Sequence, residues 1–163
     1  MPNALTLGNL FFGFWAIIAA LRGDYSLAAW LVVLAAIADG IDGRIARYAR
    51  TGSPFGTELD SLVDLVSFGV APAVLSYKLL LENGDWSWAL AFIYVAAVAT
   101  RLARFNIEQG GHARLHFHGL PSPVAGVTLS SFYPFSQTAF FAQYLSGWPW
   151  TQLLGGGMIV LGG

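Results

Sequence analysis

Residues 5–21 read LTLGNLFFGFWAIIAAL, and no charged side chain occurs anywhere in residues 1–21. About 20 consecutive, mostly apolar residues are needed for a helix to cross the hydrocarbon core of a bilayer, so this stretch predicts a first transmembrane span. The whole chain of 163 residues is 56% hydrophobic and only 10% charged. Soluble domains are about 25% charged, so a surface that faces lipid is the simplest explanation.

Five more apolar stretches follow, separated by polar turns such as Arg22-Gly23-Asp24 and residues 82–85. They predict an all-α fold, a polytopic transmembrane bundle of about six spans that forms one domain over residues 1–163. The sixth stretch is short for a span, so we expect the C-terminus of this domain to be truncated. The expected spans are residues 5–21, 26 to about 39, 56–81, 86–106, 121 to about 145, and 151–163.

Basic residues predict the orientation of this bundle. Six arginines fall near the second-to-third and fourth-to-fifth connections, whereas only Arg22 and Lys78 lie towards the other side. The positive-inside rule therefore places the first side, with the N-terminus, in the cytoplasm, and predicts a protein of the cell membrane. The six are Arg44, Arg47, Arg50, Arg101, Arg104 and Arg114.

Composition also excludes several classes of function. A net charge of −1 argues against a nucleic-acid binder, which carries a basic excess. The chain has no cysteine, so it has neither disulfides nor a thiolate metal site. No cleavable signal peptide is expected, because the first apolar stretch lacks a basic segment before it. His112, His116 and His118 lie in a polar connection without a carboxylate at comparable spacing, so we expect no metal there.

Two pairs of aspartates flank the connection between the second and third expected spans. Asp39 and Asp42 are three residues apart, and Asp60 and Asp64 are four apart. Either spacing puts both side chains of a pair on one face of a helix. Because the two spans are antiparallel neighbours, we expect all four carboxylates to converge between them, near the cytoplasmic face.

Carboxylates inside a membrane need a counter-charge. Each Asp costs about 2.5–3.5 kcal/mol on insertion scales, and four together repel one another. Two divalent cations with oxygen ligands, Mg²⁺ or Mn²⁺, are the best counterweight, and each could bridge carboxylates and a pyrophosphate. The alternative, four solvated acids at helix ends, is disfavoured by the matched spacings.

Glycines surround these acids, at positions 40, 43, 52 and 56. They could allow helices to pack closely, or leave room for a phosphate or nucleotide to approach the backbone; the sequence leaves both interpretations open. Arg47 suits a phosphate geometrically, although it could also serve as a cytoplasmic anchor.

Residues 39–47 read DGIDGRIAR, and Gly56, Asp60 and Asp64 follow. This arrangement resembles the signature of the CDP-alcohol phosphotransferase family, D-x-x-D-G-x-x-A-R-x8-G-x3-D-x3-D, at every fixed position. Members of that family are typically six-span homodimers. The resemblance implies that Asp64 is the general base on the acceptor hydroxyl. It implies a first metal held by Asp39, Asp42 and Asp60, and a second held by Asp42, Asp60 and Asp64.

The resemblance also implies which residues bind the CDP-activated lipid. Residues 2–6, PNALT, are similar to the segment that precedes the first span in many members. Contacts to the CDP pyrophosphate and ribose are implied for Gly43, Ala46, Arg47 and, less strongly, Ser53. Contacts to the CDP-lipid are implied for Asn3 and Thr6.

Two other segments are similar to the integral-membrane phosphatidylserine synthases within that family, namely residues 101–106, RLARFN, and 119–123, GLPSP. They imply CDP-diacylglycerol and L-serine as substrates, with direct attack of the serine hydroxyl and release of CMP. Their arginines and prolines could equally be cytoplasmic anchors and a helix-entry turn. Glycerol 3-phosphate, inositol phosphate or an archaeal ether lipid remain alternatives.

Two other classes of protein hold acids at a membrane. A membrane prenyltransferase also binds Mg²⁺ with Asp-rich motifs, but it has no need of the D-G-x-x-A-R element. A cation transporter would place its acids nearer the bilayer midplane, with an exit path. Release of CMP from a CDP-lipid separates these classes from the favoured one.

Overall fold

The computed structural model describes residues 2–49, 54–81, 87–110, 122–138, 141, 143 and 147–162, and these ranges contain helices but no strand. The all-α prediction is therefore confirmed. The helices are α1 (Pro2–Leu21), α2 (Tyr25–Ala49), α3 (Pro54–Asp64), η1 (Leu65–Val70), α4 (Ala71–Ser76), η2 (Tyr77–Leu81), α5 (Ser87–Gly110), α6 (Ser122–Ser136) and α8 (Trp150–Gly162).

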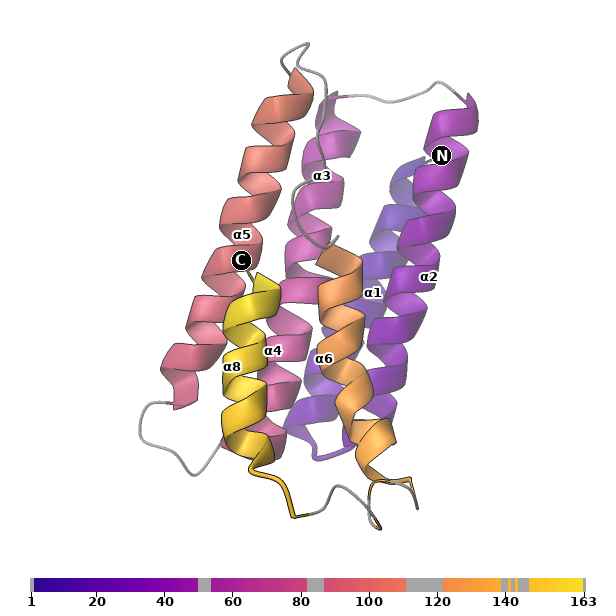
Figure 1. Cartoon of the computed structure of the whole chain (residues 1–163). Coiled ribbons are helices and arrows are strands. Elements are labelled where there is room, and N and C mark those ends of the chain that lie inside the picture. The colour runs from indigo at the N-terminus through magenta and orange to yellow at the C-terminus, as the bar shows by residue number, and fades with distance from the viewer. Residues whose placement is uncertain are drawn as a thin grey trace.

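The turn between α1 and α2 forms where the sequence predicts it. Gly23 has a φ of 85°, in the left-handed region that glycine adopts without steric cost. The backbone N–H of Asp24 donates to the carbonyl of Ala19 at 2.9 Å, which satisfies one of the last carbonyls of α1. The chain therefore reverses within three residues, and α1 and α2 form an antiparallel hairpin (Figure 1).

Small side chains fill the seam between the two helices of this hairpin. Alanine lets helix backbones approach closely, which favours helix association in a lipid environment. Phe68 of η1 and Ala71 and Leu75 of α4 pack against the same seam. The buried cluster consists of Ala16, Ala19, Ala20, Ala28, Ala29, Leu31, Val32, Ala35, Phe68, Ala71 and Leu75.

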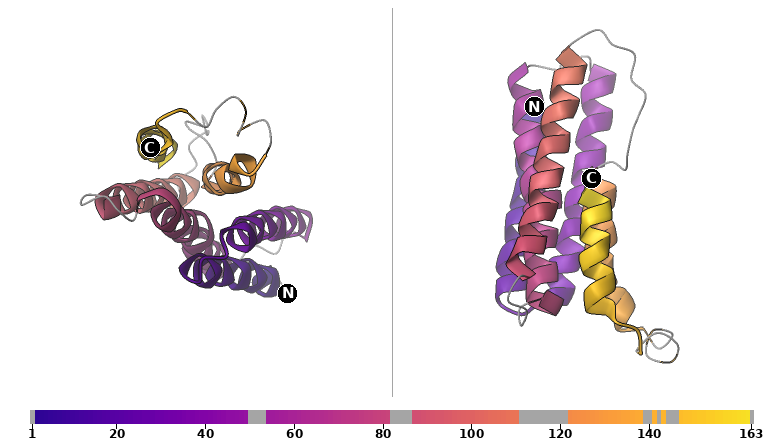
Figure 2. Two further views of the ribbon diagram at one scale, coloured as in Figure 1. Left: turned by 90° about the horizontal axis from the view of Figure 1, so that it is seen from below. Right: turned by 60° about the vertical axis from the view of Figure 1, so that its left-hand side comes forward.

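The third expected span is one continuous helix formed by α3, η1, α4 and η2, and it lies at the centre of the bundle (Figure 2). Two of its segments, η1 and η2, are π-helical, with an i→i+5 bond from the N–H of Ala71 to the carbonyl of Val66. In η1 the carbonyl of Phe68 also accepts a hydrogen bond from Tyr94 Oη of α5, at 2.8 Å. This buried bond ties α5 to the irregular part of the central helix.

Within the described part of the chain, four helices are long and apolar enough to cross a membrane: Ala4–Leu21, Tyr25–Ile45, Phe55–Leu79 and Ser87–Ile107. They match the first four expected spans. Large apolar side chains such as Phe11, Trp30 and Phe92 are about 60% exposed on these helices, as lipid-facing residues would be.

Among the described residues the fifth expected span is shorter than predicted, whereas α8 (Trp150–Gly162) covers the short sixth stretch as expected. Helix α6 ends at Ser136, not near residue 145. It contains Pro134, and beyond it the hydrogen bonds of the backbone change from i→i−4 to i→i−3. The N–H groups of Gln137 and Thr138 donate to carbonyls only three residues back. At about 1.5 Å per residue, the 15 residues of α6 fall short of a 30 Å hydrocarbon core.

One end of the bundle gathers the start of α1, the end of α2, the start of α3 and the end of α5 (Figure 1, upper end). Helices α6 and α8 pack against the opposite half. All four aspartates of the signature belong to the first of these two ends, which we call the acidic end.

Helix α1 lies very close to the central helix at Gly13. A Cβ added there would lie 2.8 Å from Ser67 Cα, which is backbone and cannot rotate away. Gly13→Ala should therefore destabilise the bundle by about 1–3 kcal/mol, because overpacking forces the helices apart. The measurement is the thermal unfolding midpoint of the purified protein in detergent. Gly8→Ala on the same helix is the control, since its Cβ would meet nothing within 4 Å; equal midpoints for the two variants would contradict the packing argument.

Candidate active site

Three of the four aspartates come together across the gap between α2 and α3. One carboxylate oxygen from each of Asp39, Asp60 and Asp64 lies within 4.8 Å of the others. Oxygen ligands of a divalent cation lie about 2.0–2.6 Å from the ion, so opposite ligands are separated by up to about 5 Å. The spacing of these three oxygens is therefore compatible with one shared cation.

Asp42 does not belong to that group of three. It lies one turn further along α2, is only 6% exposed, and accepts a hydrogen bond of 2.5 Å from Thr6 Oγ1 on its Oδ2. Its other oxygen, Oδ1, is buried and has no protein partner. The expected convergence of four carboxylates thus appears as a cluster of three with a fourth beside it, which is tied to α1.

Helix α1 forms the inner wall of the site. Thr6 and Asn9 are three residues apart and therefore share one face of α1, which packs against both α2 and α3. Asn9 Nδ2 donates to Asp64 Oδ1 at 3.4 Å, and Asn9 itself is fully buried. One helix thus contacts a carboxylate from each of its two neighbours.

Sequence reasoning missed Asn9. The available signal was a carboxamide inside an otherwise apolar stretch, one helical turn after Thr6. Its partner is 55 residues away in the chain, so no local pattern indicates the contact.

A second polar group lies on the side of α3 that faces α5. Ser61 Oγ is 3.0 Å from Asn106 Oδ1, to which it donates, and Asn106 Nδ2 donates to Glu58 Oε2 at 3.3 Å. Asn106 ends the RLARFN segment noted above, whereas Ser61 and Glu58 were not among the expected site residues. Because Ser61 follows Asp60 directly, this group borders the carboxylate cluster.

The glycines beside the acids on α2 are open. A Cβ added to Gly40 or Gly43 would meet no atom within 4 Å, and both residues are exposed. Close packing against another described helix of this chain, one of the two interpretations left open by the sequence, therefore does not explain these two glycines. Space next to Asp42 is available for another group.

Several other expected site residues lie outside the described part of the structure. Ser53, Gly52, Arg50, Arg114, the three histidines and residues 119–121 lie outside the described residues, as do the side chains of Asn3, Ala46, Arg47 and Ser122. Arg44 and Arg104 are exposed, and Arg101 is partly buried.

A divalent cation fits the residues that the structure describes. The donor set consists of carboxylate oxygens, which hard cations prefer. Two of the acids, Asp42 and Asp64, are at least nine-tenths buried, and Asp42 Oδ1 is an acceptor without a protein donor. Buried charge of one sign is stable only when it is compensated, and a bound cation would supply that compensation.

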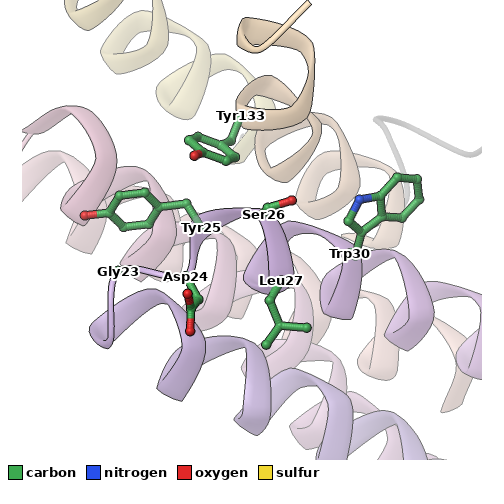
Figure 3. Close-up of a pocket in the computed structure, with 7 residues that line it drawn as sticks. All are labelled: Gly23, Asp24, Tyr25, Ser26, Leu27, Trp30 and Tyr133. Atoms are coloured by element: carbon green, nitrogen blue, oxygen red, sulfur yellow. The ribbon is translucent and has the colours of Figure 1, made fainter.

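A shallow hollow of about 470 Å³ lies at the opposite end of the bundle, at the α1–α2 turn (Figure 3). Its residues include Asp24, Trp30 and Tyr133, and the ring of Tyr133 meets that of Tyr25 edge-on at 5.6 Å. With a single carboxylate, Asp24, this hollow lacks the converging ligands of the acidic end.

Several curated proteins are similar to this chain. A CDP-diacylglycerol–serine O-phosphatidyltransferase of Helicobacter pylori (strain J99) is 42% identical over 127 residues, which cover 77% of this chain and 54% of that protein. One from Mycobacterium leprae is 36% identical over 157 residues, which cover 93% of this chain and 50% of that protein. An archaetidylserine synthase of Methanothermobacter thermautotrophicus is 37% identical over 147 residues, covering 88% and 60%.

The chain thus spans about half the length of the curated relatives that it matches. The region that it shares with them includes the helices that carry the four aspartates. Since residues 1–155 also match the profile of the CDP-alcohol phosphatidyltransferases, the chain belongs to the CDP-alcohol phosphatidyltransferase family.

Proposed function

We propose that this protein transfers a phosphatidyl group from a CDP-activated lipid to the hydroxyl of L-serine and releases CMP. The observation that carries the proposal is the group of three carboxylates, Asp39, Asp60 and Asp64, between two helices of an apolar bundle. Relatives from two bacteria are named for transfer to serine, and this supports serine as the acceptor.

The carboxylates would hold the divalent metal on which this chemistry depends. Asp39, Asp60 and Asp64 form the cluster, and the free oxygen of Asp42 adjoins it, so these four residues are the proposed ligands of two ions, Mg²⁺ or Mn²⁺. When bound, such ions neutralise charge on a pyrophosphate and stabilise the departing phosphate.

Asp64 is the proposed general base. In the proposed reaction its carboxylate takes the proton of the serine hydroxyl as the oxygen attacks the phosphorus bonded to the lipid. The bond from this phosphorus to the bridging oxygen breaks, and the electron pair leaves with CMP. Asp64 is 8% exposed and held by Asn9, so its orientation is restricted before substrate arrives.

Recognition of the CDP group is proposed for the end of α2 and the start of α1. Open space at Gly43 supports approach of a nucleotide to the backbone there. Arg47 would pair with a phosphate, with Ala46, Ser53 and Asn3 as further contacts. The hydroxyl of Thr6 already donates to Asp42, so we propose that it also acts by orienting that carboxylate.

The chain is an integral membrane protein. We further propose that it resides in the cytoplasmic membrane with the acidic end in the cytoplasm, where soluble nucleotide and serine are available. A homodimer is proposed as its assembly. Because one relative is an archaetidylserine synthase, the lipid tail could be acyl or ether-linked.

A head-group panel tests the proposed function. CMP release from CDP-diacylglycerol and from its ether-linked counterpart should occur with serine, and not with glycerol 3-phosphate or inositol phosphate. Chelation of divalent ions should abolish release, and added Mg²⁺ or Mn²⁺ should restore it. Release that is equally fast with another acceptor, or unaffected by chelation, would contradict the assignment.

Asp64→Asn should lower kcat by about 10²–10⁴-fold, because the amide cannot accept the proton of the hydroxyl. Binding of the CDP-lipid, measured by calorimetry in detergent, should change much less. Asp24→Asn, at the opposite end of the bundle and exposed, is the matched control. Unaltered turnover in Asp64→Asn would remove Asp64 as the base.

Gly43→Ala should raise the Kd for the CDP-lipid about tenfold or more, since a methyl group would occupy the space next to Asp42. The protein itself should not be destabilised, because the added Cβ meets no atom and Ala favours a helix over Gly by about 1 kcal/mol. Gly156→Ala on α8 makes the same change in open space elsewhere and should bind normally. Normal nucleotide binding by Gly43→Ala would show that the space is not used.

A further inference from the structure

Asn9 is a fully buried carboxamide that none of the expected roles includes. It lies on α1, where this helix contacts the central helix at Asp64 and Ser67, and its exposed fraction is 0%. A polar group buried without a complete set of hydrogen bonds lowers stability, so its presence in an apolar helix calls for an explanation.

The hydrogen bonds of Asn9 are incomplete in one specific way. Its Nδ2 donates to Asp64 Oδ1, whereas its Oδ1 is buried and has no partner. The reverse orientation of the amide would turn Oδ1 towards the carboxylate of Asp64 and create a repulsive contact. The amide orientation is therefore set by Asp64, and not by a gain in hydrogen bonding elsewhere.

The backbone of Asn9 is also held. Ser67 Oγ, on the first turn of η1, donates to the carbonyl of Asn9 at 3.2 Å, and Gly13 lets α1 approach Ser67 one turn later. Asp64 lies on the same central helix, three residues before Ser67. The donor, Asn9, belongs to α1 and the acceptor, Asp64, to the central helix. These two helices are held together at Ser67 and Gly13, directly beside the contact.

We propose that Asn9 is a positioning residue: its amide N–H holds the carboxylate of Asp64 in the orientation that faces Asp39 and Asp60. Thr6, one turn earlier, does the same for Asp42 through its hydroxyl. Helix α1 thereby holds Asp42 of α2 and Asp64 of α3 in fixed orientations relative to each other. The inference deepens the proposed function, because it concerns the residue to which that function assigns the base.

Asn9→Leu is the principal test, since leucine has the same branching and number of side-chain heavy atoms as asparagine and removes both the donor and the unpartnered acceptor. Loss of an outer hydrogen bond to a metal ligand typically costs about 10–100-fold in metal affinity or activity. We therefore expect kcat to fall by about 10–100-fold while KM for serine changes less than about threefold, since an interaction that orients the base affects turnover more than binding.

A second readout does not depend on turnover. Mn²⁺ binding to the purified protein, without lipid or serine, should weaken by about tenfold or more in Asn9→Leu. The thermal unfolding midpoint should change little, because the substitution removes a buried acceptor that lacks a partner but also takes the donor away from Asp64 Oδ1.

One pair of variants and one further single variant serve as controls. Asn9→Ser and Asn9→Ala differ by one hydroxyl, and the serine variant should retain more activity and Mn²⁺ affinity because it keeps a donor. Ser130→Ala removes another fully buried hydroxyl, whose Oγ has no partner, on α6 away from the acids. It should leave kcat and Mn²⁺ affinity unchanged.

The outcomes separate the two proposals. Wild-type kcat and Mn²⁺ affinity in Asn9→Leu would overturn the positioning role, as would an activity loss that only follows a lower unfolding midpoint. A rise in KM at constant kcat would also overturn it. Absence of serine-dependent CMP release in the unmodified protein would instead contradict the proposed function, while the Mn²⁺ isotherms would still test Asn9.

Discussion

Negative charge held inside an apolar helix bundle is the constraint on which this structure depends. Asp39, Asp60 and Asp64 repel one another at distances below 5 Å, in surroundings that screen charge far less than water does. A bundle that relaxed freely would turn these side chains apart. The hairpin of α1 and α2 and the central helix prevent this, because alanine-lined seams and the close approach at Gly13 leave little freedom to rotate.

Residues near each other in sequence were predictable, and contacts between distant ones were not. The charge-free run at residues 5–21 predicts α1, and the spacings of Asp39 with Asp42 and of Asp60 with Asp64 predict their shared faces. The bond from Thr6 to Asp42 joins residues 36 apart, and no periodicity indicates it. A helical period places a side chain on a face, but it does not determine which partner that face meets.

The two open interpretations of the glycines illustrate the same limit. Glycine in a helix is equally suited to contact with another backbone and to leaving space for a ligand. Gly13 contacts the backbone of another helix at Ser67, whereas Gly43 has open space around it that a ligand could enter. The end of α6 was also misjudged, because apolar residues continue past Pro134 while the backbone leaves the helix at Ser136.

The π-helical segment η1 lies directly between the acidic half of the central helix and the half that packs under α5 and α6. A π-turn holds one residue more than an α-turn, and one residue corresponds to a rotation of about 100°. Side chains after Val70 therefore point in directions rotated from those that an unbroken α-helix continuing from Asp64 would give them. Straightening residues 65–70 into a regular α-helix at the same chain length would turn the carboxylates by about 100° away from α1 and α2 without altering any of them, whereas removal of one residue would be absorbed by loss of the π-turn. The wide turn in this short stretch is thus as much a part of the site as the identity of its ligands.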